Sequence, residues 1–157
     1  MKVVNTSKGI GGQLTELRKL VEVSEKITFV GNAGFCTPFA ELMAFVLRKT
    51  DKQMAFIPDL RFDDARSIVP TPHGMQLGDS TDPRADTIVL LGGLAMPKTG
   101  IEVEQMREMV EKVLDSSEKK LIIGVCFQSV FQKMNWVEVI DFDYIIDADL
   151  TNQLLEI

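Results

Sequence analysis

A short apolar run that ends at a glycine and is followed by a helical pattern occurs three times in this chain of 157 residues. The runs are Ile27–Val30, Thr87–Leu91 and Leu121–Ile123. Continuous apolar strands that alternate with helices are typical of a parallel sheet covered on both faces. The pattern therefore predicts a single α/β domain over residues 1–157, with a Rossmann-like (flavodoxin-like), doubly wound, mostly parallel sheet in three layers.

The segments between these runs predict the remaining elements. Thr37-Pro38 is a typical helix start, with Thr37 as the expected N-cap, and Thr99 and Glu102 have the spacing of a capping box. The strand that begins at Leu121 is expected to end at Gly124. We expect helices over 13–24, over 38–49 and beyond Glu102, strands over 53–57 and 139–146, and a short helix within 60–67. Residues 69–84 are expected to form a long loop with a short strand near Met75–Leu77.

The charge distribution argues against a nucleic-acid partner. Lys and Arg total 17 and Asp and Glu total 23, which gives a formal net charge of −6. Six acidic residues and no basic one follow Lys133, so the rest of the chain is electrically neutral. Proteins that bind nucleic acids carry a basic face, and none is indicated here.

The composition also limits the compartment and the chance of a metal site. Two cysteines are too few for a disulfide scaffold or a cysteine-rich zinc site. No apolar run approaches the ~18 residues of a membrane span, and no signal peptide is indicated. We therefore expect a cytoplasmic protein with reduced thiols and no membrane partner. The acidic pairs Asp141/Asp143 and Asp147/Asp149 alternate along a strand, which favours a solvated edge over a metal site.

Three loops are expected to meet at one edge of the sheet. In an open parallel sheet, the loops that follow the strands share the carboxyl edge, where ligands bind. Glycines in these loops turn backbone N–H groups toward a ligand, and a helix N-terminus favours an anion. The sequence therefore predicts a site for an anionic or nucleotide-like small molecule, although plain turns explain the same glycines. The predicted ligand-binding residues are Gly31, Asn32, Gly34, Thr37, Gly92, Gly93, Cys126 and Gln128.

Two cysteines and one histidine are the candidates for nucleophilic chemistry. Cys126 follows a buried strand, and Cys36 precedes a helix start, where an exposed thiol has a lowered pKa. His73 is the only imidazole that could serve as their base. Each residue also has a structural interpretation, as a buried thiol or an exposed loop histidine. We expect no Cys–His–acid triad, because Gln128 stands where a nucleophile elbow requires a small residue.

The stretch from Ile88 to Gly93, followed by Ile123-Gly-Val-Cys-Phe-Gln128, resembles class I glutamine amidotransferase-like domains over about residues 86–135. This resemblance implies that Cys126 corresponds to the nucleophile and that Gly92 and Gly93 correspond to the oxyanion loop. That family has a glycine where Gln128 stands and a catalytic histidine after the cysteine, and no histidine follows Cys126 here. The resemblance implies the architecture, without glutaminase activity.

Nearly the whole chain resembles a family of small uncharacterised proteins of methanogenic archaea. The stretches that carry this resemblance are Val30–Phe39, Asp59–Arg66 and Leu90–Pro97. It implies an archaeal, cytoplasmic protein with a Rossmann-like fold, and it implies no activity.

Three functions remain open from the sequence. The first is a small-molecule-binding domain with its site at the carboxyl edge. The second is a Cys-dependent hydrolase or amidotransferase-like enzyme that uses Cys126. The third is a non-catalytic partner-binding or homodimeric domain. The sequence does not decide whether the protein is an enzyme, and it indicates no particular cofactor.

Overall fold

The computed structural model describes residues 1–157 and contains one seven-stranded sheet. The strands are β1 (Lys26–Gly31), β2 (Gln53–Pro58), β3 (Arg66–Thr71), β4 (Gly74–Ser80), β5 (Thr87–Leu91), β6 (Leu121–Phe127) and β7 (Tyr144–Ala148). Their spatial order is β4-β3-β2-β1-β5-β6-β7. Strands β2, β1, β5, β6 and β7 run parallel to one another, whereas β3 and β4 form an antiparallel extension at one side.

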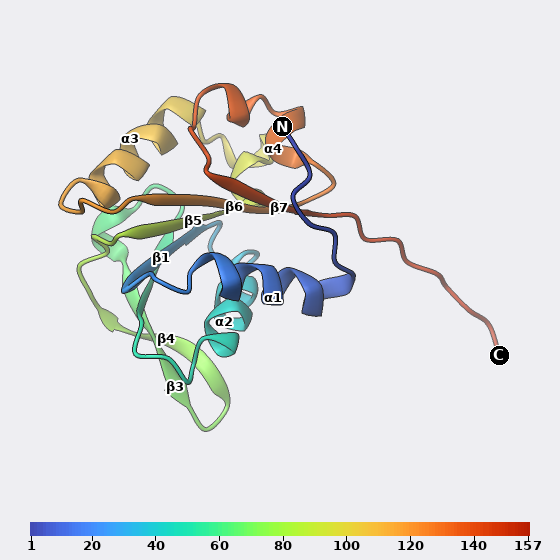
Figure 1. Cartoon of the computed structure of the whole chain (residues 1–157), viewed down its shortest axis with the longest axis horizontal. Coiled ribbons are helices and arrows are strands. Elements are labelled where there is room, and N and C mark those ends of the chain that lie inside the picture. Colours follow the sequence, from blue (N-terminus) through green and yellow to red (C-terminus); the bar gives the residue numbers. More distant parts are fainter.

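Helices cover both faces of this sheet, α1 and α2 on one face and α3 and α4 on the other (Figure 1). The helices are α1 (Gly9–Leu20), α2 (Thr37–Val46), α3 (Val103–Leu114) and the one-turn α4 (Val130–Lys133). The 3₁₀ turns are η1 (Phe62–Asp64), η2 (Gly92–Ala95), η3 (Pro97–Thr99) and η4 (Trp136–Glu138). None of the helices is both long and apolar enough to cross a membrane.

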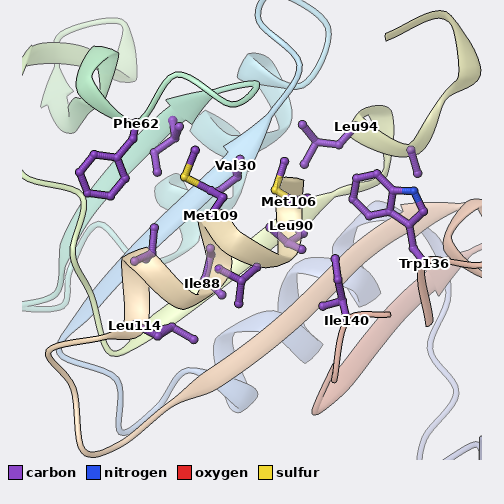
Figure 2. Packing of buried hydrophobic residues seen from close by; sticks show 14 of the residues in the cluster. Val30, Phe62, Ile88, Leu90, Leu94, Met106, Met109, Leu114, Trp136 and Ile140 are labelled. Atoms are coloured by element: carbon purple, nitrogen blue, oxygen red, sulfur yellow. The ribbon is translucent and has the colours of Figure 1, made fainter. Parts of the chain in front are cut away.

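Each face of the sheet has its own buried cluster of apolar side chains. In β5, Ile88 and Leu90 point into the cluster beneath α3, and Val89 and Leu91 point into the cluster beneath α1 and α2. Figure 2 shows the first cluster, with Met106 of α3 lying over Leu90. A strand buried on both faces needs an apolar residue at every position, which explains the unbroken run in β5.

The predicted mixed α/β architecture, with a mostly parallel sheet flanked by helices, is therefore confirmed. The predicted strands over 27–30, 53–57 and 87–91 match β1, β2 and β5 within a residue. The predicted helix over 13–24 lies at Gly9–Leu20, four residues earlier.

The loop predicted over residues 69–84 is wrong for most of its length, because this segment forms the hairpin of β3 and β4, and the short strand expected near Met75–Leu77 is part of β4. The predicted short helix within 60–67 is reduced to η1, and β3 begins at Arg66. Only two hairpin side chains, Ile68 and Met75, are buried, and both lie in the cluster beneath α1 and α2. The apolar pattern was therefore too sparse to indicate two paired strands, and packing against α2 stabilises the pair.

The predicted end of β6 at Gly124 is also wrong. Gly124 lies in the middle of the strand, in register with Leu90 of β5 and Ile145 of β7. A Cβ atom at this position would lie 3.0 Å from the rings of Phe131 and Phe142. This glycine therefore makes room for two aromatic rings and does not end the strand.

Two helix starts differ from the predicted ones. The N-cap of α2 is Cys36, and Thr37 is the first helical residue. The capping box of α3 is formed by Glu102 and Gln105, not by Thr99 and Glu102. The Thr99 hydroxyl instead donates to the carbonyl oxygens of Leu94 and Met96 at 2.9 Å. The Thr99 side chain, which the sequence pattern assigned to the helix cap, thus stabilises a local turn instead.

Candidate functional site

The carboxyl ends of β1, β5 and β6 lie side by side, because these three strands are parallel neighbours in the sheet. Gly31 ends β1, Gly92 follows β5 and Gln128 follows β6. The chain order reverses at β1, with β2 on one side and β5 on the other. Open α/β sheets bind ligands at such a point. The three predicted loops thus share one edge, with Gln128 rather than Gly124 beginning the third.

The loop after β1 is held by hydrogen bonds within the protein. Gly34 has φ +82°, and its N–H donates to the Thr37 hydroxyl at 3.1 Å. The Asn32 amide donates to the Asp59 carboxylate at 2.9 Å, which joins the ends of β1 and β2. The polar side chains of Asn32 and Thr37 are therefore engaged in shaping the loop.

Two of the predicted site glycines are packed against Cys36. A Cβ atom on Gly93 would lie 2.4 Å from the Cys36 sulfur, and one on Gly31 would lie 2.4 Å from the Cys36 Cβ. Such distances are shorter than any real Cβ contact, so only glycine fits at both positions without a shift. The group that lies close to the backbone at these two glycines is the Cys36 side chain of the protein itself.

Cys36 is a buried side chain, with only 2% of its surface exposed. Burial is the largest cause that raises the pKa of its thiol above the usual value, and hydrogen bonds from the Asn32 and Gly93 backbone oppose that shift. The thiol is therefore protonated at neutral pH despite its place at the start of α2.

Cys126 lies within β6 and is packed against Gly92. A Cβ atom on Gly92 would be 2.6 Å from the Cys126 Cβ. Burial, followed by the negative charge of Asp147, raises the pKa of the Cys126 thiol to about 12. The thiol donates a hydrogen bond to Asp147 at 3.4 Å, which is consistent with the protonated form. Cys126 thus lacks the thiolate that nucleophilic chemistry requires.

The third loop is fastened by two acidic residues that the sequence analysis assigned to a solvated edge. Gln128 and Ser129 both have φ +57°, which is rare for residues with side chains. Asp147 accepts hydrogen bonds from the Ser129 N–H at 2.9 Å and hydroxyl at 2.5 Å. Asp149 accepts one from the Gln128 amide at 2.7 Å. These carboxylates offset the cost of the strained turn, and only the pairing of β6 with β7 reveals their role.

The structure does not bring His73 to either cysteine. His73 lies in the exposed turn between β3 and β4. Strands β2, β1 and β5 separate β3 from β6, and four interstrand spacings correspond to about 19 Å. The candidate base and Cys126 therefore belong to different regions of the sheet.

Between the start of α2 and the ends of β5 and β6 lies a small cavity of about 30 Å³, lined mainly by apolar side chains. Three aromatic rings line it, those of Phe35, Phe39 and Phe127, and the last two have centroids 5.4 Å apart. Gly92 and Gly93 complete the wall. The sequence analysis missed these rings, although each of the three lies in or beside one of the glycine loops.

Phe35 is the exposed member of this group, with 57% of its surface open to solvent. The Lys98 ammonium lies 5.7 Å from the centroid of its ring, within the range of a cation–π contact. The outer side of the cavity thus combines an aromatic ring with a positive charge.

A larger hollow lies at the opposite, amino edge of β1 and β2. Its lining residues are Ser24, Glu25, Lys26, Asp51, Lys52 and Gln53, and none of them is apolar. The Lys52 ammonium donates to the Glu22 and Ser24 carbonyls at 2.8 and 2.7 Å. This open, polar surface lacks the apolar wall of a typical small-molecule site, so the carboxyl edge is the better candidate.

Both native thiols are expected to resist alkylation in the folded protein. At pH 8, a thiol with a pKa of about 12 is ionised to roughly one part in 10⁴, and burial blocks access as well. Iodoacetamide labelling followed by mass spectrometry should show both cysteines unmodified until guanidinium unfolds the chain. A Ser116→Cys variant, whose thiol would be exposed, provides the control and should be labelled within minutes. Fast labelling of Cys126 in the folded wild type contradicts this assignment.

Comparison with known proteins assigns the chain to a family. Residues 8–151 match the family described as uncharacterized proteins conserved in archaea, DUF2124. An uncharacterized protein of Methanocaldococcus jannaschii is 45% identical over 151 residues, which cover 94% of this chain and 90% of the relative. An uncharacterized protein of Methanothermobacter thermautotrophicus is 37% identical over 155 residues, 99% of each chain.

A solved structure is similar to this chain in both sequence and fold. The crystal structure of a protein of unknown function from Methanothermobacter thermautotrophicus has 37% sequence identity and a TM-score of 0.92, and the match covers 99% of this chain and 98% of that one. The predicted archaeal resemblance is thereby confirmed, whereas the amidotransferase-like resemblance stays a prediction. The chain belongs to the archaeal family of uncharacterized proteins DUF2124.

Proposed function

We propose that this protein binds a small molecule with a planar ring and an anionic group at the carboxyl edge of the sheet, where β1, β5 and β6 end. The observation that carries the proposal is the aromatic cavity of Phe35, Phe39 and Phe127 beside Gly92 and Gly93. Ligand sites combine such apolar walls with a few polar groups. The five parallel strands lie side by side in the order β2, β1, β5, β6, β7, so in chain order they are the second, first, third, fourth and fifth. This order supports a doubly wound, flavodoxin-like sheet whose switch point lies at this edge.

The apolar part of the ligand fits the position of the Phe35 ring. A cavity of about 30 Å³ corresponds to roughly one water molecule, so a ring enters only when Phe35 moves aside. Phe35 is free to do so, because more than half of its surface is exposed. The incoming ring then packs against Phe39 and Phe127 in its place.

The anionic part fits the charges at the rim. Helix α2 begins at Thr37 and has no acidic residue in its first turn, so its N-terminus favours a negative group. Lys98 forms no ion pair with a carboxylate and lies near Phe35. A phosphate or carboxylate beside the bound ring therefore meets both the helix end and the ammonium.

Binding rather than cysteine chemistry is the function that these observations support. Both thiols are buried, their pKa values are raised, and His73 lies on a distant hairpin. An enzyme of the hydrolase or amidotransferase type requires a thiolate and a base within hydrogen-bond reach. No observation at this edge supplies that pair.

Flavin mononucleotide and adenosine monophosphate are suitable probes, because each joins a planar ring to a phosphate. At a probe concentration 100 times its Kd, binding stabilises the folded state by about 2.7 kcal/mol. For a chain of this size, that raises the melting temperature by roughly 5–10 °C. Riboflavin, adenosine and inorganic phosphate test the ring and the anion separately and should give smaller shifts.

Two variants locate the site and two serve as matched controls. Phe39→Ala, which removes a ring against which the incoming ring packs, and Lys98→Met are each expected to raise the probe concentration needed for a given thermal shift at least tenfold. Phe45→Ala and Lys49→Met change the same residue types at the other end of α2 and should leave the shift unchanged. Equal shifts in all four variants would place the site elsewhere. No shift with either nucleotide, together with no bound small molecule in native mass spectrometry, would contradict the proposal.

A further inference from the structure

The last residues of the chain form an arm that touches almost nothing. Beyond β7 the chain extends away from the body (Figure 1). In this C-terminal arm, residues 150–157, Leu155 is 77% exposed and Leu154 and Ile157 are fully exposed. Leu150 is partly covered, with 41% of its surface exposed, and the arm's one hydrogen bond to the rest of the protein is a long one of 3.5 Å from the Gln128 amide to the Leu150 carbonyl oxygen.

The composition of this arm is unusual for a solvated tail. Segments that stay in water are typically polar and lack large apolar side chains. Here four of the eight residues are leucine or isoleucine, Leu150, Leu154, Leu155 and Ile157. Side chains of this kind remain exposed in a single copy because nothing in that copy covers them, so the arm fits a partner surface.

A second exposed arm lies at the same side of the sheet. The N-terminal arm, residues 1–8, is exposed throughout, including Val3 and Val4. Its Met1 sulfur lies 3.9 Å from the Gln132 amide on α4, and Asn5 donates to Glu16 on α1 at 2.7 Å. Since α4 and α1 cover opposite faces and α1 contacts β7, this arm passes around the β7 side of the sheet (Figure 1).

The two arms carry opposite charges. The N-terminal arm contains Lys2 and Lys8 and no acidic residue. The C-terminal arm contains Glu156, and the whole segment after Lys133 has six acidic residues and no basic one. Strand β7 pairs only with β6, so its outer edge has no strand partner. An apolar, acidic arm and an apolar, basic arm thus flank an unpaired sheet edge.

We propose that two copies of this chain form a symmetric dimer in which the C-terminal arm of each copy packs against the N-terminal arm and the β7 edge of the other. A second copy suits this surface because it carries both complementary arms, and a two-fold axis satisfies both contacts at once. Leucine and valine side chains of the arms become buried together, and the lysines face the acidic segment.

The mass of the protein in solution tests the dimer. Light scattering after size-exclusion chromatography should give twice the chain mass of 17.5 kDa for the wild type. Changing Leu154→Asp together with Leu155→Asp should weaken dimerisation at least 100-fold and yield the monomer mass. Val23→Asp places a charge at an equally exposed apolar residue away from the arms and should leave the dimer intact. A wild-type monomer at 100 µM overturns the proposal, and so does a dimer that survives the double change.

Mixed isotopic labelling tests the exchange of arms between copies. Chains grown in light and heavy nitrogen are mixed, equilibrated and treated with a carbodiimide, which joins a lysine amine to a nearby carboxylate. Crosslinks of Lys2 or Lys8 to Glu156 that join one light and one heavy chain are the expected result. Crosslinks found only within single chains would show that each C-terminal arm folds onto its own copy, which contradicts the proposal.

Discussion

Replacing Phe131 with alanine is expected to lower the free energy of unfolding by about 3–5 kcal/mol. Phe131 is fully buried, and its ring lies 5.6 Å from the Trp136 ring and 5.1 Å from the Phe142 ring. It also fills the space left open by Gly124 in β6. Its loss creates a cavity bordered by rigid rings and a central strand, which cannot collapse readily.

Urea unfolding followed by circular dichroism measures this loss, since fluorescence of Trp136 is altered directly by the missing ring. The melting temperature should fall by roughly 6–20 °C. Met134→Ala, just beyond the same helix, removes a half-exposed side chain and is expected to change stability by about 1 kcal/mol at most. A loss below 1 kcal/mol for Phe131→Ala would show that the ring is not a central packing element.

The strands at the centre of the sheet were predictable because burial on both faces leaves a strong signal. Every residue of β5 is buried, so the run from Thr87 to Leu91 contains no exposed position that could blur its ends. At the sides of the sheet this signal fades. β7 contains exposed and half-buried residues but no fully buried one, and it was predicted as an edge strand with its start too early.

Glycine was the main source of error along the sheet. Gly92 follows its strand, as predicted, whereas Gly124 lies inside β6. The difference arises from Phe131 and Phe142, whose rings come from later parts of the chain and occupy the space above Gly124. A contact between residues so far apart in sequence leaves no local pattern, so no periodicity argument separates the two glycines.

The candidate site was predictable in place but not in chemistry. The carboxyl edge follows from the parallel strands, and the structure brings Gly31, Gly92, Gly93 and Gln128 to it. The aromatic lining depends on where each ring points, which the strand and helix pattern does not give. The hydrogen bonds of Asp147 to Ser129 likewise depend on the register of β6 and β7.

Replacing Gly92 with alanine is expected to lower the free energy of unfolding by about 3 kcal/mol, at the upper end of typical overpacking costs. The new Cβ atom would lie 2.6 Å from the Cys126 Cβ, 3.1 Å from its Cα and 2.9 Å from a methyl group of Val130. Two of these atoms belong to a central strand or are attached directly to it. Relief therefore requires a shift of β5 against β6, which the parallel pairing resists.

Gly11→Ala is the control for the change of residue type. Gly11 lies in α1 with nothing within 4 Å of the added atom and without a positive φ. Alanine there is expected to stabilise the protein by about 0.5–1 kcal/mol, because it favours the helix. The two substitutions add the same methyl group and should therefore change stability in opposite directions, as measured by urea unfolding.

The neighbouring glycine tests whether the cost comes from the named contact. Gly93→Ala brings its Cβ atom to 2.4 Å from the Cys36 sulfur, at the end of a side chain rather than in the backbone. Cys36→Ala removes that sulfur, so the double variant should be more stable than the sum of the two single losses predicts, by 1 kcal/mol or more. Cys126→Ala cannot rescue Gly92→Ala in this way, because the opposing Cβ and Cα atoms of residue 126 remain. Equal rescue at both positions would contradict the distinction between side-chain and backbone contacts.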